Sequence, residues 1–221
     1  NFKALGRTYK ALLSNPQFLS AALVMGGALG ALYAQATFLP FILMDEVGLT
    51  PAQFGASMLA QSGSFFTASL LVRQLMGRFS ADRLVGPGLV FVALGSLGTL
   101  TLLLWPPSFL HVMVPVATYS FGIAFVMPAM STAALAPFGR AAGAAASMLG
   151  FIQMGSGLLV GSLGALMGNA LLAMATLIPM MGAVACVSFL VYRTIQPRPA
   201  AAAPADTRAT WTWSGARAAV C

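Results

Sequence analysis

The sequence predicts an all-α integral membrane protein with six transmembrane helices, arranged as two inverted repeats of three helices. Of the 221 residues, 59% are hydrophobic and 7% are charged, and the mean hydropathy is +0.88. Soluble domains carry about a quarter of their residues as charges. Six apolar stretches also exceed the roughly 20 residues that a helix needs to cross a bilayer. They are residues 17–44, 54–75, 84–105, 109–136, 141–167 and 170–191.

The second observation is the alternation of charge between these stretches. All eleven lysines and arginines lie before the first stretch or near the segments that follow the second, the fourth and the sixth. The other connections carry Asp45 and Glu46, then His111, then no charge. Because cytoplasmic loops retain basic residues during insertion, both termini are expected in the cytoplasm. The same topology explains the basic pI of about 10.3, so we expect membrane lipid, and no nucleic acid, beside these loops.

The third observation is a repeat within the chain. The sequence ASMLA at 56–60 recurs as ASMLG at 146–150, and Pro40 in the first stretch has a counterpart in Pro128 of the fourth. Three helices are an odd number, so the second triplet enters the membrane from the opposite side. Inverted repeats of this kind are common in transporters.

The chain divides into three segments. Residues 1–16 are interpreted as a cytoplasmic approach segment, and residues 17–195 as one six-helix transmembrane bundle. Residues 196–221 are rich in Ala, Pro and Thr, which predicts a disordered cytoplasmic tail. The first residue is Asn1 and a full-length span follows its basic lead, so we expect a fragment of a longer chain.

Residues suited to catalysis are scarce. The chain has one histidine, His111, and none of its four acidic residues falls in the middle of an expected span. No metal-ligand spacing, no nucleophile with a partner base and no phosphate-binding glycine loop occurs in the sequence. The sequence therefore predicts that the protein is not an enzyme, with no catalytic residue, metal site or cofactor.

Polar residues are shared unevenly among the expected spans. The first, second, fourth and fifth carry most of them, including Gln35, Gln61 and Gln153. An amide in hydrocarbon needs a partner or water. We therefore expect these four spans to surround an interior and the third and sixth to face lipid. The alternative is that the polar side chains only form hydrogen bonds between helices.

A glycine series marks the fifth stretch. Gly143, Gly150, Gly157 and Gly164 recur every seven residues, which is two helical turns. Small residues at this spacing form a smooth stripe on which another helix can pack closely. We expect this stripe to serve helix packing.

The fifth stretch also carries a family resemblance. Residues 142–153 (AGAAASMLGFIQ) resemble the eleventh helix of the drug/proton antiporters of the Bcr/CflA (bicyclomycin/chloramphenicol resistance) type, within the major facilitator superfamily. The sequence FLPF at 38–41, and the Met-Pro and Ala-Pro pairs at 127–128 and 136–137, are similar to the same exporters. The loop from Gly77 to Asp82 departs from the superfamily's loop motif because it is one residue longer.

The resemblance implies that this chain is the C-terminal half of a twelve-helix carrier in the bacterial inner membrane. Such a carrier exports small hydrophobic or amphipathic drugs by alternating access. It uses the proton gradient as its energy source, and its coupling acid lies largely in the other half. The implied partners are the drug and an N-terminal six-helix half, or a second copy of this chain. The resemblance places these residues at the substrate cavity: Tyr33, Gln35, Phe38, Gln61, Tyr119, Phe125 and Gln153.

Two other functions are open from the sequence alone. A carrier of the same fold could move a small metabolite, although the scarcity of charge in the spans argues against strongly charged substrates. A six-helix scaffold or channel subunit would transport nothing by itself, and the uneven sharing of polar residues weighs against it.

Overall fold

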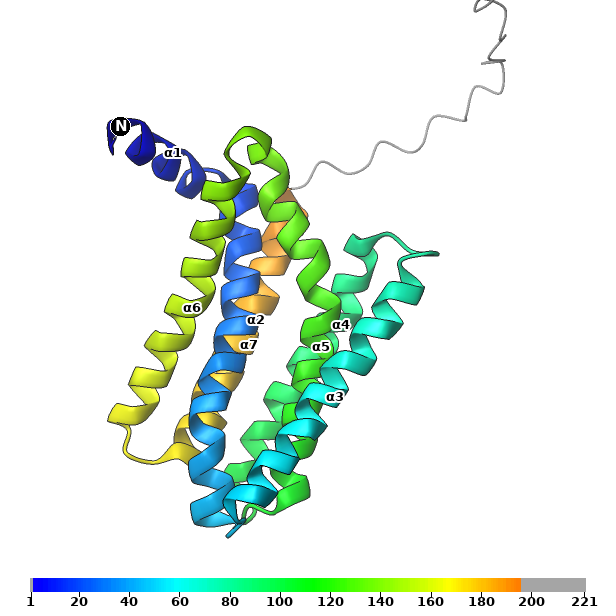
Figure 1. The fold of residues 1–221 in the computed structure, drawn as a ribbon, viewed down its shortest axis with the longest axis vertical. Coiled ribbons are helices and arrows are strands. Elements are labelled where there is room, and N and C mark those ends of the chain that lie inside the picture. Colours follow the sequence, from blue (N-terminus) through cyan, green and yellow to red (C-terminus); the bar gives the residue numbers. More distant parts are fainter. Residues whose placement is uncertain (1, 196–221) are drawn as a thin grey trace, which may run out of the picture.

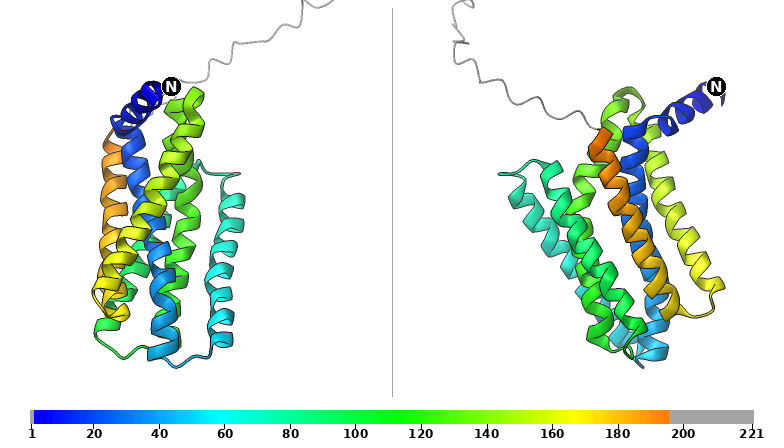
Figure 2. Two further views of the ribbon diagram at one scale, coloured as in Figure 1. Left: turned by 60° about the vertical axis from the view of Figure 1, so that its left-hand side comes forward. Right: turned by 180° about the vertical axis from the view of Figure 1, so that it is seen from behind.

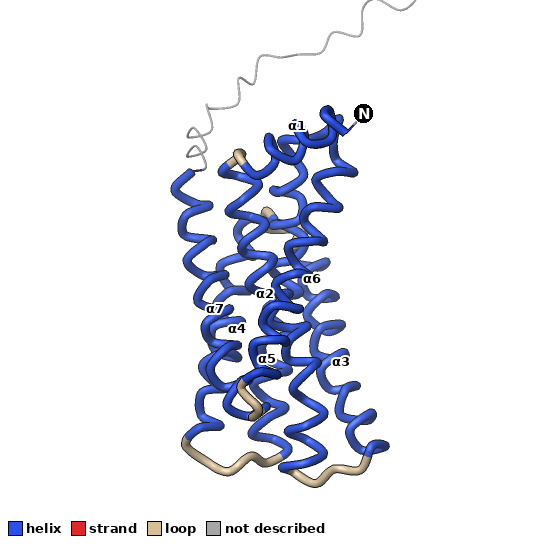
Figure 3. Tube along the Cα trace, turned by 90° about the vertical axis from the view of Figure 1, so that its left-hand side faces the viewer, coloured by secondary structure: helices blue, strands red, loops and turns tan. Residues whose placement is uncertain are grey.

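The computed structural model describes residues 2–195, which form helices joined by short turns, with no strand in that range (Figure 3). The expected tail at 196–221 lies outside the described residues. In chain order the elements are α1 (Phe2–Leu13), α2 (Pro16–Pro40), the π-helix η1 (Phe41–Glu46), α3 (Pro51–Leu75), α4 (Ala81–Leu100), the 3-10 helix η2 (Thr101–Leu103), α5 (Phe109–Leu135), the 3-10 segment η3 (Ala136–Ala141), α6 (Ala142–Leu166) and α7 (Ala170–Ile195).

Five of the described helices are long and apolar enough to cross a membrane. They span Pro16–Glu46, Ala81–Leu103, Phe109–Gly139, Ala142–Leu166 and Ala170–Ile195. The prediction of a helical, multi-pass membrane protein is confirmed at this level. Helix α3 is 25 residues long and coincides with the second expected span. Its glutamines, serines and threonines make it less apolar than the other five, so six spans remain a prediction.

Local sequence signals set where the helices begin. The Asn15 side chain accepts a hydrogen bond from the Phe18 backbone N–H at the start of α2. At the start of α3, Thr50 and Gln53 bond each other's backbone N–H groups, which forms a capping box. These side chains satisfy backbone donors that a helix leaves unpaired at its first turn. Pro16 and Pro51 occupy the first helical turn, where the missing N–H costs nothing.

Helices α2 and α5 form the centre of the bundle. Helix α2 packs against α6, α7 and α5, while α5 also packs against α3 and α4. The core contains the largest buried side chains of both helices, such as Phe18 and Met25 from α2 and Tyr119 and Ile123 from α5. In Figures 1 and 2, α6, α2, α5 and α3 make one face, and α7 and α4 lie behind α2 and α5.

The third and sixth expected spans correspond to α4 and α7. They were expected to face lipid, but in the structure they also pack inside the bundle. Helices α4 and α7 do lie on the face opposite α3 and α6, but they also contact each other and supply part of the core. Within the described residues, the four polar-rich helices lie side by side in one face, so the interior that they were expected to surround stays a prediction. Helices α3 and α6 stand at the two edges of their face and expose large apolar side chains, among them Leu59, Phe66, Phe151 and Leu158.

The connections divide between the two ends of the bundle. The α3–α4 connection, the η3 turn, α1 and the end of α7 lie at one end, which we call the basic end (Figure 1). The η1–α3, α4–α5 and α6–α7 connections lie at the other, the acidic end, which carries Asp45 and Glu46. The alternation of charge along the sequence thus becomes a separation in space.

Residues 1–16, interpreted as an approach segment, contain a helix that the sequence analysis did not predict. Helix α1 extends outward from the basic end on the α6 side, at an angle to the bundle axis (Figure 1). Pro16 cannot continue a helix from the preceding residues, because it lacks a backbone N–H and restricts the residue before it. The chain therefore turns sharply between α1 and α2.

Candidate functional site

The expected cavity residues from α2 contact α6. A Cβ atom added at Gly157 would lie 2.8 Å from the Tyr33 Cβ, and one at Gly164 would meet the Phe38 ring. Tyr33 is nevertheless 40% exposed, whereas Phe38 is buried. Glycine at 157 and 164 therefore makes room for two aromatic side chains of the neighbouring helix.

The glycine stripe is used only over its second half. Gly143 and Gly150 have no described atom within 4 Å of the position that a Cβ would occupy. The first half of α6 still packs on the core through the buried Ala145 and Leu149, but its two glycines do not mark a close approach of another described helix. The expectation of one continuous packing stripe is corrected accordingly.

Tyr119 and Phe125 serve helix packing. Tyr119 is fully buried, and its hydroxyl donates a hydrogen bond to the Ala28 backbone oxygen at 3.0 Å, which joins α5 to α2. Phe125 is also buried, with its ring centroid 5.4 Å from that of Phe121 and 6.3 Å from that of Phe91. Neither residue lines the acidic-end or the basic-end pocket described below, so their place at a substrate cavity stays a prediction.

We expect Tyr119→Phe to lower the free energy of unfolding by about 1 kcal/mol, the typical net contribution of one hydrogen bond. The phenyl ring fills the same space, so only the hydroxyl is lost. Denaturation in mixed detergent micelles measures the change. Tyr33→Phe is the matched control, because the Tyr33 side chain is partly exposed and should tolerate the loss. Equal stability of both variants would contradict a structural role for the Tyr119 hydroxyl.

The three glutamines differ in their surroundings. Gln35 is fully buried, and neither its Nε2 nor its Oε1 has a hydrogen-bond partner among the described residues. Gln61 in α3 and Gln153 in α6 are half-buried. Gln35 is therefore a core residue, whereas Gln61 and Gln153 lie partly at the surface of the described bundle.

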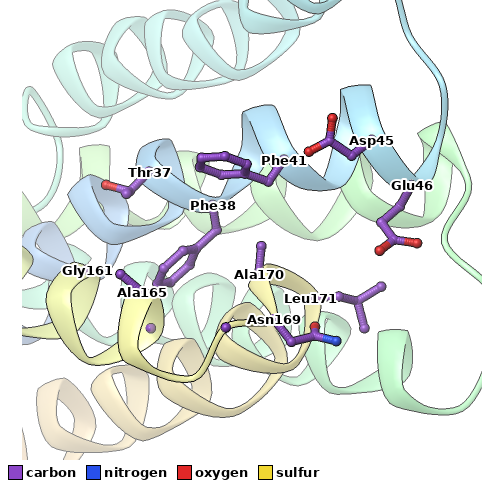
Figure 4. Close-up of a pocket in the computed structure, with 12 residues that line it drawn as sticks. Thr37, Phe38, Phe41, Asp45, Glu46, Gly161, Ala165, Asn169, Ala170 and Leu171 are labelled. Carbon is purple, nitrogen blue, oxygen red and sulfur yellow. The ribbon is translucent and has the colours of Figure 1, made fainter.

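A pocket of about 400 Å³ opens at the acidic end, and we call it the acidic-end pocket (Figure 4). Figure 4 shows the Phe38 ring pointing toward Gly161 and Ala165, with Asp45 and Glu46 at the rim. Its walls come from the end of α2 with η1, from the last turns of α6 and from the start of α7. Of the expected cavity residues, only Phe38 lies here.

A second pocket, of about 550 Å³, lies at the basic end between α3 and α5, and we call it the basic-end pocket. Its walls are mostly apolar, with three polar side chains: Ser69, Arg73 and Ser131. The remaining lining residues are Phe65, Val72, Met76, Ala124, Met127 and Pro128. A largely apolar wall with a few polar groups is typical of ligand pockets.

The two pockets are built from corresponding positions of the chain. On its α3 side, the basic-end pocket is lined by positions 69, 72, 73 and 76. On its α6 side, the acidic-end pocket is lined by positions 161, 164, 165 and 168, and each of these lies 92 residues after its counterpart. On the other wall of the acidic-end pocket, α2 supplies positions 37 and 38 and η1 supplies position 41. The matching wall of the basic-end pocket comes from α5 positions 127, 128 and 131, each displaced by 90. Because α2 and α5 run in opposite directions, these equivalent walls open at opposite ends.

Two serine hydrogen bonds follow the same correspondence. Ser64 in α3 donates to the Ala117 backbone oxygen of α5 at 2.7 Å, and Ser156 in α6 donates to the Gly26 oxygen of α2 at 2.8 Å. Each serine is the last residue of a four-residue pattern, Q-x-G-S, which occurs at 61–64 and again at 153–156. The repeat expected from ASMLA and ASMLG is displaced by 90 positions, two fewer than this pattern, and so does not place Gln61 opposite Gln153 as this pattern does.

Among the described residues, no group of three His, Cys, Asp or Glu side chains is placed to hold a metal ion. The full sequence matches no protein-family model and no curated protein.

Proposed function

We propose that this chain is half of a membrane carrier that moves small hydrophobic or amphipathic molecules by alternating access. The observation that carries the proposal is the pair of equivalent pockets at opposite ends of the bundle. A carrier must present its substrate path to each side in turn. Two inverted triplets achieve this when they exchange conformations, because each triplet then closes the end that the other opens.

The pairing of helices supports the same architecture. Helix α2 packs against α6 and α7, and α5 packs against α3 and α4, as two inverted triplets would require. The serine bonds repeat between α3 and α5 and between α6 and α2. The second alternative, a scaffold or channel subunit, does not require pockets of matching construction at both ends.

The chemistry of the pocket walls supports the class of substrate. Both pockets combine apolar and small side chains with few charges, which suits apolar or amphipathic ligands with a polar group. Methionines such as Met76 and Met127 adapt their shape to varied ligands. We further propose that protons drive the export, that the carrier lies in a bacterial inner membrane and that its basic end faces the cytoplasm. These points rest on the family resemblance and on the charge pattern.

The exposed edges support the expectation of a partner half. Helices α3 and α6 expose Phe66, Phe151 and Leu158, and carry the half-buried Gln61 and Gln153. In a twelve-helix carrier a second six-helix half would cover these edges and complete a central path. A second copy of this chain is the other candidate partner.

A drug-tolerance screen in a pump-deficient bacterium tests the proposal. It compares this chain with a version extended upstream by its natural sequence, at matched amounts in the membrane. Tolerance conferred only by the extended version would support a two-half exporter. Tolerance from this chain alone would support pairing of two copies, and none from either would favour a metabolite carrier or a subunit that transports nothing.

Within an active carrier, we expect Gln153→Leu to reduce drug tolerance without reducing insertion. Loss of one hydrogen bond to the ligand weakens binding about tenfold. Gln74→Leu, at an exposed position in the last turn of α3, is the matched control. The readouts are the minimal inhibitory concentration and the amount of protein in the membrane. Unchanged tolerance at equal amounts would remove Gln153 from the substrate path.

A further inference from the structure

Helix α1 has the most one-sided distribution of apolar residues among the described helices. The helical period places Arg7 and Lys10 on one side and Tyr9, Leu12 and Leu13 on the other. Membrane-spanning helices are apolar around most of their circumference. A helix with a basic side and an apolar side is instead typical of one that lies in the interface between water and lipid.

The position of α1 agrees with that distribution. From the start of α2 at the basic end, the helix extends outward past α6, at an angle to the long helices (Figures 1 and 2). Leu12 is fully buried and Tyr9 packs against the core from its edge, so the apolar side of α1 faces the bundle. Arg7 and Lys10 are exposed.

Leu13 adds an apolar side chain that the protein does not cover. It is 48% exposed and lies at the last residue of α1, next to the turn into α2. With α1 at the membrane surface, the Leu13 side chain would enter the boundary between the lipid headgroups and the acyl chains. The bundle therefore covers only part of the apolar side of α1. The rest of that side is available for contact with lipid.

The charge of the basic end indicates which lipid is favoured. Arg78 lies in the connection between α3 and α4, Arg73 lies in the last turn of α3, and the first turn of α4 holds Arg83 and the acidic Asp82. The α7 helix ends with Arg193 in its last turn. Basic segments beside a membrane attract anionic headgroups, and each cation near the surface contributes roughly a fivefold gain in affinity.

We propose that α1 is an interfacial anchor, which binds anionic phospholipid through Arg7 and Lys10 while Leu13 enters the acyl-chain boundary. The anchor holds the segment before α2 flat against the membrane at the basic end. This role is independent of transport, because it depends only on the position and chemistry of α1. Two cations predict that anionic lipid shifts the docking equilibrium of α1 by ~30-fold at low salt.

Hydrogen exchange of the full 221-residue chain in lipid nanodiscs tests the anchor. We compare nanodiscs of phosphatidylcholine alone with nanodiscs that contain phosphatidylglycerol, and measure exchange of the α1 amides. We expect exchange to slow by up to ~30-fold with phosphatidylglycerol, and the difference to shrink at high salt because ions screen exposed charges. Exchange that is equally slow in both lipids would mean that the protein alone holds α1, and would overturn the proposal.

Two variants separate the contribution of α1 from that of the whole basic end. Arg7→Gln combined with Lys10→Gln should abolish the effect of phosphatidylglycerol on α1, while the exchange of α5 amides stays unchanged. Arg78→Gln removes one exposed charge from the α3–α4 connection and should leave most of the effect in place. A loss of the effect in Arg78→Gln, or its persistence in the double variant, would assign lipid binding to the basic end in general and overturn the role of α1.

Discussion

We expect Gly122→Ala to lower the free energy of unfolding by about 3 kcal/mol, at the upper end of what overpacking costs in a close-packed core. A Cβ atom at position 122 would lie 2.5 Å from the Gly88 backbone oxygen and 2.7 Å from the Val92 backbone nitrogen. Both are main-chain atoms of α4, so no side-chain rotation can relieve the overlap. The two helices would have to separate along an extensive contact.

Denaturation in mixed detergent micelles measures this loss, with protein inserted at matched levels. Gly63→Ala is the control, because no described atom lies within 4 Å of a Cβ atom built at position 63 in α3. Alanine favours a helix more than glycine does, so this variant should be as stable as the original or slightly more stable. If Gly122→Ala unfolds at the same detergent fraction as Gly63→Ala, the close approach of α4 and α5 is wrong.

We expect Gln35→Met to raise the free energy of unfolding by about 1 to 2 kcal/mol. Both amide atoms of Gln35 are buried without a hydrogen-bond partner among the described residues. An unpaired buried polar group costs about 1 to 3 kcal/mol, and methionine has nearly the same length without that cost. The substitution should therefore stabilise the core of α2.

The comparison with Gln61→Met makes this prediction specific. Gln61 is half-buried, so its replacement removes a smaller cost and should change stability less. A loss of stability in Gln35→Met would show that the amide is satisfied by a bound water or by a group outside the described residues. A gain in stability together with a loss of drug tolerance would mean that the carrier retains Gln35 for transport, at the expense of stability.

Some features of the bundle could be predicted because they depend on short segments and their local physics. A long apolar stretch must form a helix in lipid, since no water is available for its backbone groups. The positions of the lysines and arginines predicted which connections share an end of the molecule, and the structure agrees for the segments it describes. Helix α1 could also have been found, from its basic and apolar sides, but its short length and polar residues favoured a linker.

The candidate site was harder to predict, because an apolar helix gives no sign of which side faces a neighbour. Tyr119 and Gln61 were both expected at a cavity, yet one lies in the core and the other is half-buried in an edge helix. Gly143 and Gly164 share one stripe, but only the latter meets another helix. The rotation of each helix about its axis depends on packing against distant parts of the chain.

The sequence by itself determined that this chain is helical and crosses a membrane several times, and which connections carry positive charge. These properties follow from transfer of apolar residues into lipid and from retention of basic loops, which act on each segment separately. Only the tertiary structure decided that Tyr119 joins α5 to α2, that Gln35 lacks a hydrogen-bond partner among the described residues, and that residues 69–76 and 161–168 line equivalent pockets. Those properties arise from close contact between helices far apart in sequence, where a few ångströms of approach determine which side chain is buried and which lines a pocket.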